Sequence, residues 1–190
     1  MGNFSTGLSR RNFVMSGAAL GGLAACGNGV GSQGGARIDA RVDQAFNFMY
    51  TNIPGTQDLA TKAVGVLMMP VVSKVGLIGP GGSYGRGALR INDVTVDYYS
   101  TTSATFGFQL GAQQYSNALF FMTEDALADF RRSPGWTLGA DAEYVVSNEA
   151  GNLGVDTTTA LSPVIAVIFG QAGLIAGATI EGNKYSRIIP

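Results

Sequence analysis

The residue with the clearest chemical role in this sequence is Cys26, the single thiol of the 190-residue chain. It directly follows Leu23-Ala24-Ala25, and small residues here allow a signal peptidase to close around the backbone. Cleavage after Ala25 would leave Cys26 at the N-terminus with a thiol that can carry lipid. A lone cysteine is more often a small buried hydrophobe, but the run Gly27–Gly35 is too rich in glycine to form a core. We therefore expect Cys26 to be lipidated.

The residues before Cys26 have the pattern of an export signal. Arg10 and Arg11 precede Phe13, and an apolar run of small residues extends from Val14 to Ala25. This run is too short to cross a bilayer core, which needs about 20 apolar residues. The segment resembles a twin-arginine signal joined to a bacterial lipoprotein box, and a general secretory signal is the alternative. We expect a lipid-anchored protein on the periplasmic side of a bacterial envelope, in the outer membrane.

Few residues in this chain have the chemistry of an active site. It contains no histidine, so the commonest general base and the commonest transition-metal ligand are missing. The sequence has no GxSxG motif and no metal-ligand spacing, and the glycine-rich segment 79–83 lacks the lysine and hydroxyl of a P-loop. That segment indicates a turn. We therefore expect that the protein is not an enzyme and that it has no cofactor and no metal site.

The charges of the chain are unevenly distributed. The chain has 12 basic and 13 acidic residues, and removal of residues 1–25 takes away two of the basic ones. The remaining negative charge gives no support for a nucleic-acid partner. Residues 26–91 are net basic, whereas residues 92–190 are strongly acidic. If the domain contacts anionic lipid, the candidates for headgroup binding are the basic residues Arg37, Arg41, Lys62, Lys74 and Arg86.

Three polar residues interrupt apolar patterns typical of strands, namely Gln109, Asp141 and Glu181. Buried charges are costly unless they are paired or hydrogen-bonded. We expect these side chains to form a structural polar network. The alternative is a small polar site for a lipid headgroup or another polar ligand inside an apolar pocket.

Helical patterns occur in three places. Residues 26–37 are predicted to form a flexible tether after the signal, and apolar residues at helical spacing then predict an amphipathic helix over residues 38–51. We expect this helix to pack on the core, and a helix on the membrane surface is the alternative. A short helix should follow Gly55 with Thr56 as its N-cap. A third is predicted over residues 123–132, capped by Thr123 and stopped by Pro134.

The rest of the domain has strand patterns punctuated by glycine, which suits a curved sheet with bulges. We therefore expect a single α+β domain over residues 38–190, in which an antiparallel sheet tends towards a barrel. The predicted strands are residues 63–69, ended by Pro70, and residues 94–99, 105–110, 118–122, 138–146, 164–169 and 174–180.

Five motifs follow one another along the sequence: Lys62-Ala63-Val64-Gly65-Val66-Leu67, the segment 76–87 ending in Tyr84-Gly85-Arg86-Gly87, the segment 106–113, Gly139-Ala140-Asp141-Ala142 and the segment 173–182. In this order and spacing they resemble the SYLF domain family, and the resemblance extends from about Ile38 to the C-terminus. It implies a lipid-binding module, whose partner here is a phospholipid membrane. The alternative is a structural or assembly lipoprotein that binds another envelope protein and uses lipid only as an anchor.

Overall fold

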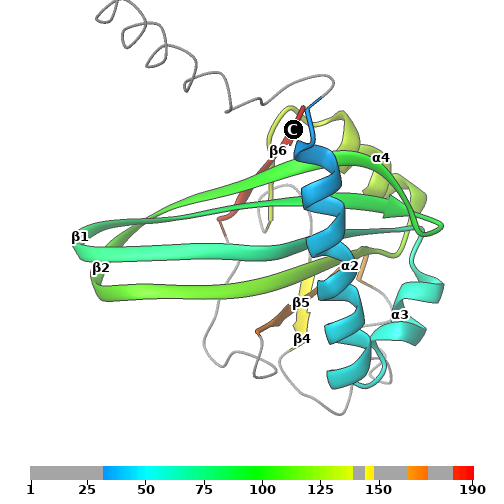
Figure 1. Cartoon of the computed structure of the whole chain (residues 1–190), viewed down its shortest axis with the longest axis horizontal. Helices are drawn as coiled ribbons and strands as arrows, with labels where there is room; N and C mark the ends of the chain where they lie inside the picture. The colour runs from blue at the N-terminus through cyan, green and yellow to red at the C-terminus, as the bar shows by residue number, and fades with distance from the viewer. Residues whose placement is uncertain (1–31, 139–143, 148–161, 171–181) are drawn as a thin grey trace, which may run out of the picture.

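The computed structural model describes residues 32–138, 144–147, 162–170 and 182–190. In this part of the chain, helices pack against a six-stranded curled sheet (Figure 1), which confirms the expected α+β class. None of the described helices is long and apolar enough to span a bilayer. In chain order the elements are α2 Gly34–Asn52, α3 Thr56–Lys62, β1 Gly65–Ile91, β2 Val94–Phe121, α4 Glu124–Arg132, β3 Trp136–Thr137, β4 Tyr144–Ser147, β5 Val164–Phe169 and β6 Lys184–Ile188.

A long ribbon of β1 and β2 forms most of the sheet. The two strands pair antiparallel from Gly65 opposite Phe121 to Ile91 opposite Val94. The turn between them consists of Asn92 and Asp93, with φ values of 50° and 63°. Positive φ at both central residues is the geometry of a tight hairpin turn. The three strands predicted over residues 94–122 are therefore one strand, β2.

Two predicted breaks in β1 are wrong. The strand continues through Pro70, where the register with β2 shifts between Met69 and Val72. A bulge tolerates proline because it does not need every backbone N–H for pairing. The predicted turn at residues 79–83 is also strand, since each of these residues pairs with a residue in 103–107 of β2. A long partner strand in register thus overrides the local turn preference of glycine and proline.

The ribbon bends back on itself, so that the two halves of β1 lie against each other (Figure 1). Gly85 and Gly87 permit this close approach. A Cβ atom on Gly85 would lie 2.8 Å from the carbonyl oxygen of Val71, and one on Gly87 would lie 2.6 Å from Sδ of Met69. Side chains at these two positions would therefore push the halves of β1 apart.

Helix α2 packs on one side of the sheet, as the amphipathic pattern predicts. Its buried residues join a hydrophobic cluster with Met68, Phe120 and Phe169 of the strands. The helix begins at Gly34, earlier than predicted, so the end of the expected tether 26–37 is helical. The buried residues of α2 are Ile38, Val42, Ala45, Phe46 and Met49.

The next helix, α3, follows Gly55 as predicted, but its N-cap is Gly55 and not Thr56. Gly55 has a φ of 83°, a left-handed conformation that glycine adopts without strain. The buried hydroxyl of Thr56 instead donates a hydrogen bond to the carbonyl oxygen of Ile53, at 2.8 Å. It fixes the turn between α2 and α3.

Helix α4 covers a second, aromatic cluster. Thr123 caps it, as predicted, by accepting a hydrogen bond from the backbone N–H of Ala126. Phe130 is fully buried, with its ring centroid 4.6 Å from that of Tyr99 and 4.8 Å from that of Phe121. Trp136 meets Phe130 edge-on at 5.3 Å. These rings fix α4 to β2 and β3.

The remaining strands complete the sheet in the order β3-β6-β2-β5-β4, with β1 on β2. Strand β5 confirms the prediction for residues 164–169. The pair β4–β5 is parallel, unlike the antiparallel pairing expected throughout. Of the predicted strand 138–146, residues 144–146 lie in β4, while residues 139–143 and the predicted strand 174–180 lie outside the described part.

Candidate anion-binding pocket

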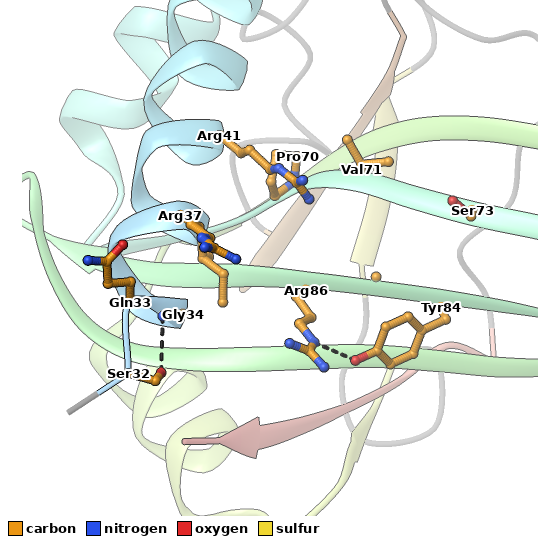
Figure 2. A pocket seen from close by; sticks show the side chains of 12 residues that line it. Ser32, Gln33, Gly34, Arg37, Arg41, Pro70, Val71, Ser73, Tyr84 and Arg86 are labelled. Atoms are coloured by element: carbon orange, nitrogen blue, oxygen red, sulfur yellow. Dashed lines mark hydrogen bonds between the residues drawn. The ribbon is translucent and has the colours of Figure 1, made fainter. Parts of the chain in front are cut away.

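A cavity of about 570 Å³ lies between the start of α2 and the bent strand β1 (Figure 2). The helix segment contributes one wall and the two halves of β1 contribute the other. No acidic residue belongs to the lining. The lining residues are Ser32, Gln33, Gly34, Arg37, Ile38 and Arg41 from the helix side, and Pro70, Val71, Ser73, Tyr84, Gly85 and Arg86 from β1.

Arg37 and Arg41 are one helical turn apart, so their side chains lie on the same face of α2. Burial of Ile38 and Val42 against the sheet fixes the rotation of the helix and turns both arginines towards the cavity. Among the described residues, neither guanidinium has a hydrogen bond or an ion pair. Their charges therefore face the cavity without neutralisation by a neighbouring carboxylate.

Arg86 reaches the cavity from the second half of β1. Its Nε donates a hydrogen bond to the Tyr84 hydroxyl at 2.6 Å, and its guanidinium carbon lies 5.8 Å from the centroid of the Tyr84 ring. Figure 2 shows this pair opposite Val71 and Ser73. The bond to Nε orients the guanidinium but occupies only one of its five N–H donors.

The first residues of α2 lie beside Pro190, the last residue of the chain. The hydroxyl of Ser32 accepts the N–H of Gly34 at 3.0 Å and donates to the carbonyl oxygen of Pro190 at 2.7 Å. No acidic residue occupies the first turn of the helix. The N-terminal end of a helix carries partial positive charge. An oxygen of Pro190 already lies at this end of α2, so the preference of the cavity for an anion rests on the three guanidinium groups. A phosphate group can accept paired hydrogen bonds from arginine.

The acidic residues of α2 are held by the sheet, away from the cavity lining. Asp39 accepts hydrogen bonds from the hydroxyls of Thr95 at 2.9 Å and Tyr98 at 2.7 Å. Burial, followed by this bond to Asp39, raises the pKa of Tyr98 to about 12. Asp43 pairs with Arg90 at 2.6 Å. These contacts fix α2 to β1 and β2 and thereby fix Arg37 and Arg41 relative to Arg86.

The structure thus brings together three of the five basic residues proposed from the sequence. Lys62 ends α3, and Lys74 lies in β1 next to Ser73; neither belongs to the lining. Adjacent strand residues point to opposite sides, which explains why Ser73 faces the cavity and Lys74 does not. Sequence reasoning assigned no role to Tyr84, although its spacing of two from Arg86 places both on one side of a strand.

The other residues singled out in the sequence lie outside this site. Gln109 belongs to β2, but its side chain is not among those described. Asp141 and Glu181, together with the signal residues Arg10, Arg11 and Ala25 and the lipidation candidate Cys26, fall outside the described residues. Within the described ranges, no three His, Cys, Asp or Glu side chains form a group that could hold a metal ion.

Residues 102–187 match the family model Ysc84, described as "Las17-binding protein actin regulator". No curated protein matches the chain. The matched segment begins within β2 and ends within β6, so it includes α4 and its aromatic neighbours Phe121 and Trp136, but not Tyr99, α2 or β1. Ysc84 is a SYLF family of binding domains. Residues 102–187 are therefore similar to the Ysc84 (SYLF) family, which confirms over this segment the resemblance drawn from the sequence motifs.

Proposed function

We propose that this domain binds anionic phospholipid headgroups at a membrane surface through the pocket between α2 and β1. The observation that carries the proposal is the convergence of Arg37, Arg41 and Arg86 on one cavity with no carboxylate in its lining. A phosphodiester is an anion with oxygens spaced for guanidinium hydrogen bonds. The similarity of residues 102–187 to a family of binding domains supports a binding role.

The proposal includes lipid attachment at Cys26 after removal of residues 1–25, with the domain held on the periplasmic side of the outer membrane. Ser32 belongs to the pocket lining and is six residues from Cys26 in the sequence. Six residues span at most about 20 Å even when fully extended. A lipid on Cys26 would therefore keep the pocket close to the bilayer that holds it.

Binding of purified residues 27–190, which lack the lipid, to vesicles tests this function. We expect binding to vesicles that contain phosphatidylglycerol and none to pure phosphatidylcholine. Each basic residue near an anionic surface contributes about 1 kcal/mol, and salt screens exposed charges over about 8 Å at physiological ionic strength. Binding should therefore weaken as salt increases. Absence of binding to the anionic vesicles at low salt would contradict the proposal.

A matched pair of charge reversals locates the site. Arg37 and Lys62 are both exposed cations on helices, but only Arg37 lines the pocket. Reversal of one charge changes the local charge by two, so we expect Arg37→Glu to weaken binding to anionic vesicles at least tenfold. Lys62→Glu should have a clearly smaller effect. An equal loss in both variants would indicate attraction by the overall charge of the domain and not by the pocket.

The alternative function is attachment to another envelope protein, with lipid serving only as an anchor. The family description names a protein partner for its member, which favours a test of this alternative. Under it, the domain would fail to bind anionic vesicles. A photoreactive residue in place of Gln33, which lines the pocket, would then form a crosslink to a protein in intact cells, and this result distinguishes the two functions.

A further inference from the structure

Three large apolar side chains are exposed on β1 beside the arginine pocket. Val71 is 40% exposed, Val75 is 51% exposed and Tyr84 is 48% exposed. Val71 and Tyr84 belong to the pocket lining itself. Val75 lies two residues beyond Ser73, another lining residue, and the pairing of residues 72–75 with β2 is regular. Strand alternation therefore places Val75 on the same side of β1 as Ser73.

No described helix covers this part of the sheet. Figure 1 shows the β1–β2 ribbon extending beyond α2, on the side away from α3 and α4. Single exposed apolar residues are normal on a protein surface. A group of them next to an arginine pocket is different, because it combines apolar contact with attraction for anions on one face.

We propose that this face of β1, formed by Val71, Val75 and Tyr84, inserts into the headgroup region of an anionic bilayer while the arginines hold lipid phosphates. The inference rests on the function proposed above and adds the orientation of the domain on the membrane. Charge complementarity favours a bilayer as the occupant, since Arg37, Arg41 and Arg86 adjoin the apolar residues. Tyrosine is enriched at membrane interfaces, and arginine extends its charge towards headgroups.

The position of Ser32 gives an independent reason for this orientation. Ser32 lines the same pocket and is six residues after the lipidation candidate Cys26. The proposed anchor therefore joins the domain at the face that carries the exposed apolar residues. A bilayer that holds this anchor would therefore lie close to the face that carries Val71 and Tyr84.

Tryptophan fluorescence tests the orientation in residues 27–190, the lipid-free protein of the vesicle assay above, so that neither an acyl group nor the apolar segment before Cys26 contributes. Val75→Trp places a probe on the proposed inserting face, and Val94→Trp is the matched control. Val94 is 63% exposed, lies next to the turn between β1 and β2 and does not line the pocket. The native Trp136 is buried and gives the same background in both variants.

With phosphatidylglycerol vesicles, we expect the Val75→Trp emission to shift to shorter wavelength and to be quenched by brominated acyl chains. The Val94→Trp emission should stay unchanged. If vesicles bind the protein but the Val75→Trp emission does not change, the inserting face is wrong and headgroup binding stands. If Val94→Trp responds as strongly as Val75→Trp, the orientation is also wrong. If the vesicles do not bind the protein at all, both the inference and the proposed function fail.

A second pair of variants measures the contribution of the apolar contact. Val75→Asp should weaken binding to anionic vesicles about tenfold, because it removes apolar contact and adds a charge that anionic lipid repels. Val94→Asp adds the same charge and should weaken binding less than threefold. Equal losses would show that charge alone, and not insertion of β1, explains the effect.

Discussion

The arginines around α4 and those around the start of α2 differ in what faces them. Near α4, Arg131 and Arg187 both contact the carboxylate of Asp97, at 3.0 and 3.2 Å. Around the start of α2, the guanidinium groups of Arg37, Arg41 and Arg86 share a cavity whose lining contains no carboxylate. Arginine thus forms ion pairs within the protein in one region and remains available to an external anion in the other.

The two regions also differ in how they are stabilised. The α4 region rests on a cluster of aromatic rings with centroids 4.6 to 6.4 Å apart. The pocket region is stabilised by the close approach of the two halves of β1 at Gly85 and Gly87, and by the hydrogen bonds that Asp39 accepts from β2. We therefore expect substitutions near α4 to change stability alone, and substitutions around the pocket to change binding.

The largest expected effect is on the aromatic cluster. Phe130→Ala should lower the free energy of unfolding by about 3–5 kcal/mol, because truncation of a buried phenylalanine loses apolar contacts and leaves a cavity. Urea denaturation measures this loss. The fraction that remains folded should bind anionic vesicles as the wild type does. A decrease of less than about 1 kcal/mol in the free energy of unfolding would contradict the role of Phe130 in stabilising the aromatic cluster.

Substitution of Gly87 should act on both stability and binding. A Cβ atom at Gly87 meets Sδ of Met69 at 2.6 Å and comes still closer to the carbonyl oxygen of Met68. Gly87→Ala should therefore destabilise the domain by about 1–3 kcal/mol and displace the adjacent Arg86. Gly65→Ala is the control, since its Cβ would meet only the flexible side chain of Leu127 at 3.2 Å and a backbone oxygen at 3.4 Å. Thermal unfolding that ranks Gly65→Ala as the more damaging change would overturn this account.

Tyr98 should make stability depend on pH under alkaline conditions. Because folding raises the pKa of Tyr98 from 10.0 to about 12, the folded state favours the protonated phenol. The resulting stabilisation is complete below pH 10 and is lost as the pH rises towards 12. Tyr98→Phe removes this loss, and costs about 1 kcal/mol at neutral pH through the missing bond to Asp39.

Denaturation of wild type and Tyr98→Phe at pH 8 and pH 11 measures this difference. Burial also raises the pKa of Tyr50 and of Tyr99, so both proteins should lose stability at high pH. The wild type should lose more. Equal losses would show that the raised pKa of Tyr98 does not carry the pH dependence.

The smallest effect is expected for Arg132, whose pair with Asp129 is three residues away on α4 and largely exposed. Surface pairs of this kind contribute about 0.5 kcal/mol or less. Arg132→Ala should therefore leave both the unfolding midpoint and vesicle binding close to wild type. A large loss of vesicle binding would contradict the proposed difference between the arginines around α4 and those of the pocket.

Local signals in the sequence predict the helices well. The apolar spacing of α2 predicts its buried face, and Thr123 and Pro134 mark the ends of α4 because capping and chain termination depend on neighbouring residues. The paths of β1 and β2 could not be predicted in the same way. Pro70 and the glycines of segment 79–83 have turn preferences, which pairing with a distant strand overrides.

The candidate site, too, could be predicted only in part from the sequence. Charge alone identifies Arg37, Arg41 and Arg86 as candidates, together with Lys62 and Lys74. Their separation into lining and non-lining residues depends on the bend that brings residues 84–86 beside residues 70–73. No local pattern specifies that bend, because it follows from contacts between the two halves of β1.

The most direct test of the central claim compares charge reversal at the two arginine groups. Vesicle sedimentation with phosphatidylglycerol should be measured for Arg37→Glu/Arg41→Glu/Arg86→Glu and for Arg131→Glu/Arg132→Glu. At about 1 kcal/mol for each basic residue, we expect the triple variant to lose at least about 100-fold in affinity. The double variant should lose clearly less at the same salt concentration. Equal losses for the two variants, or retained binding by the triple variant, would contradict the claim that the pocket between α2 and β1 binds the lipid.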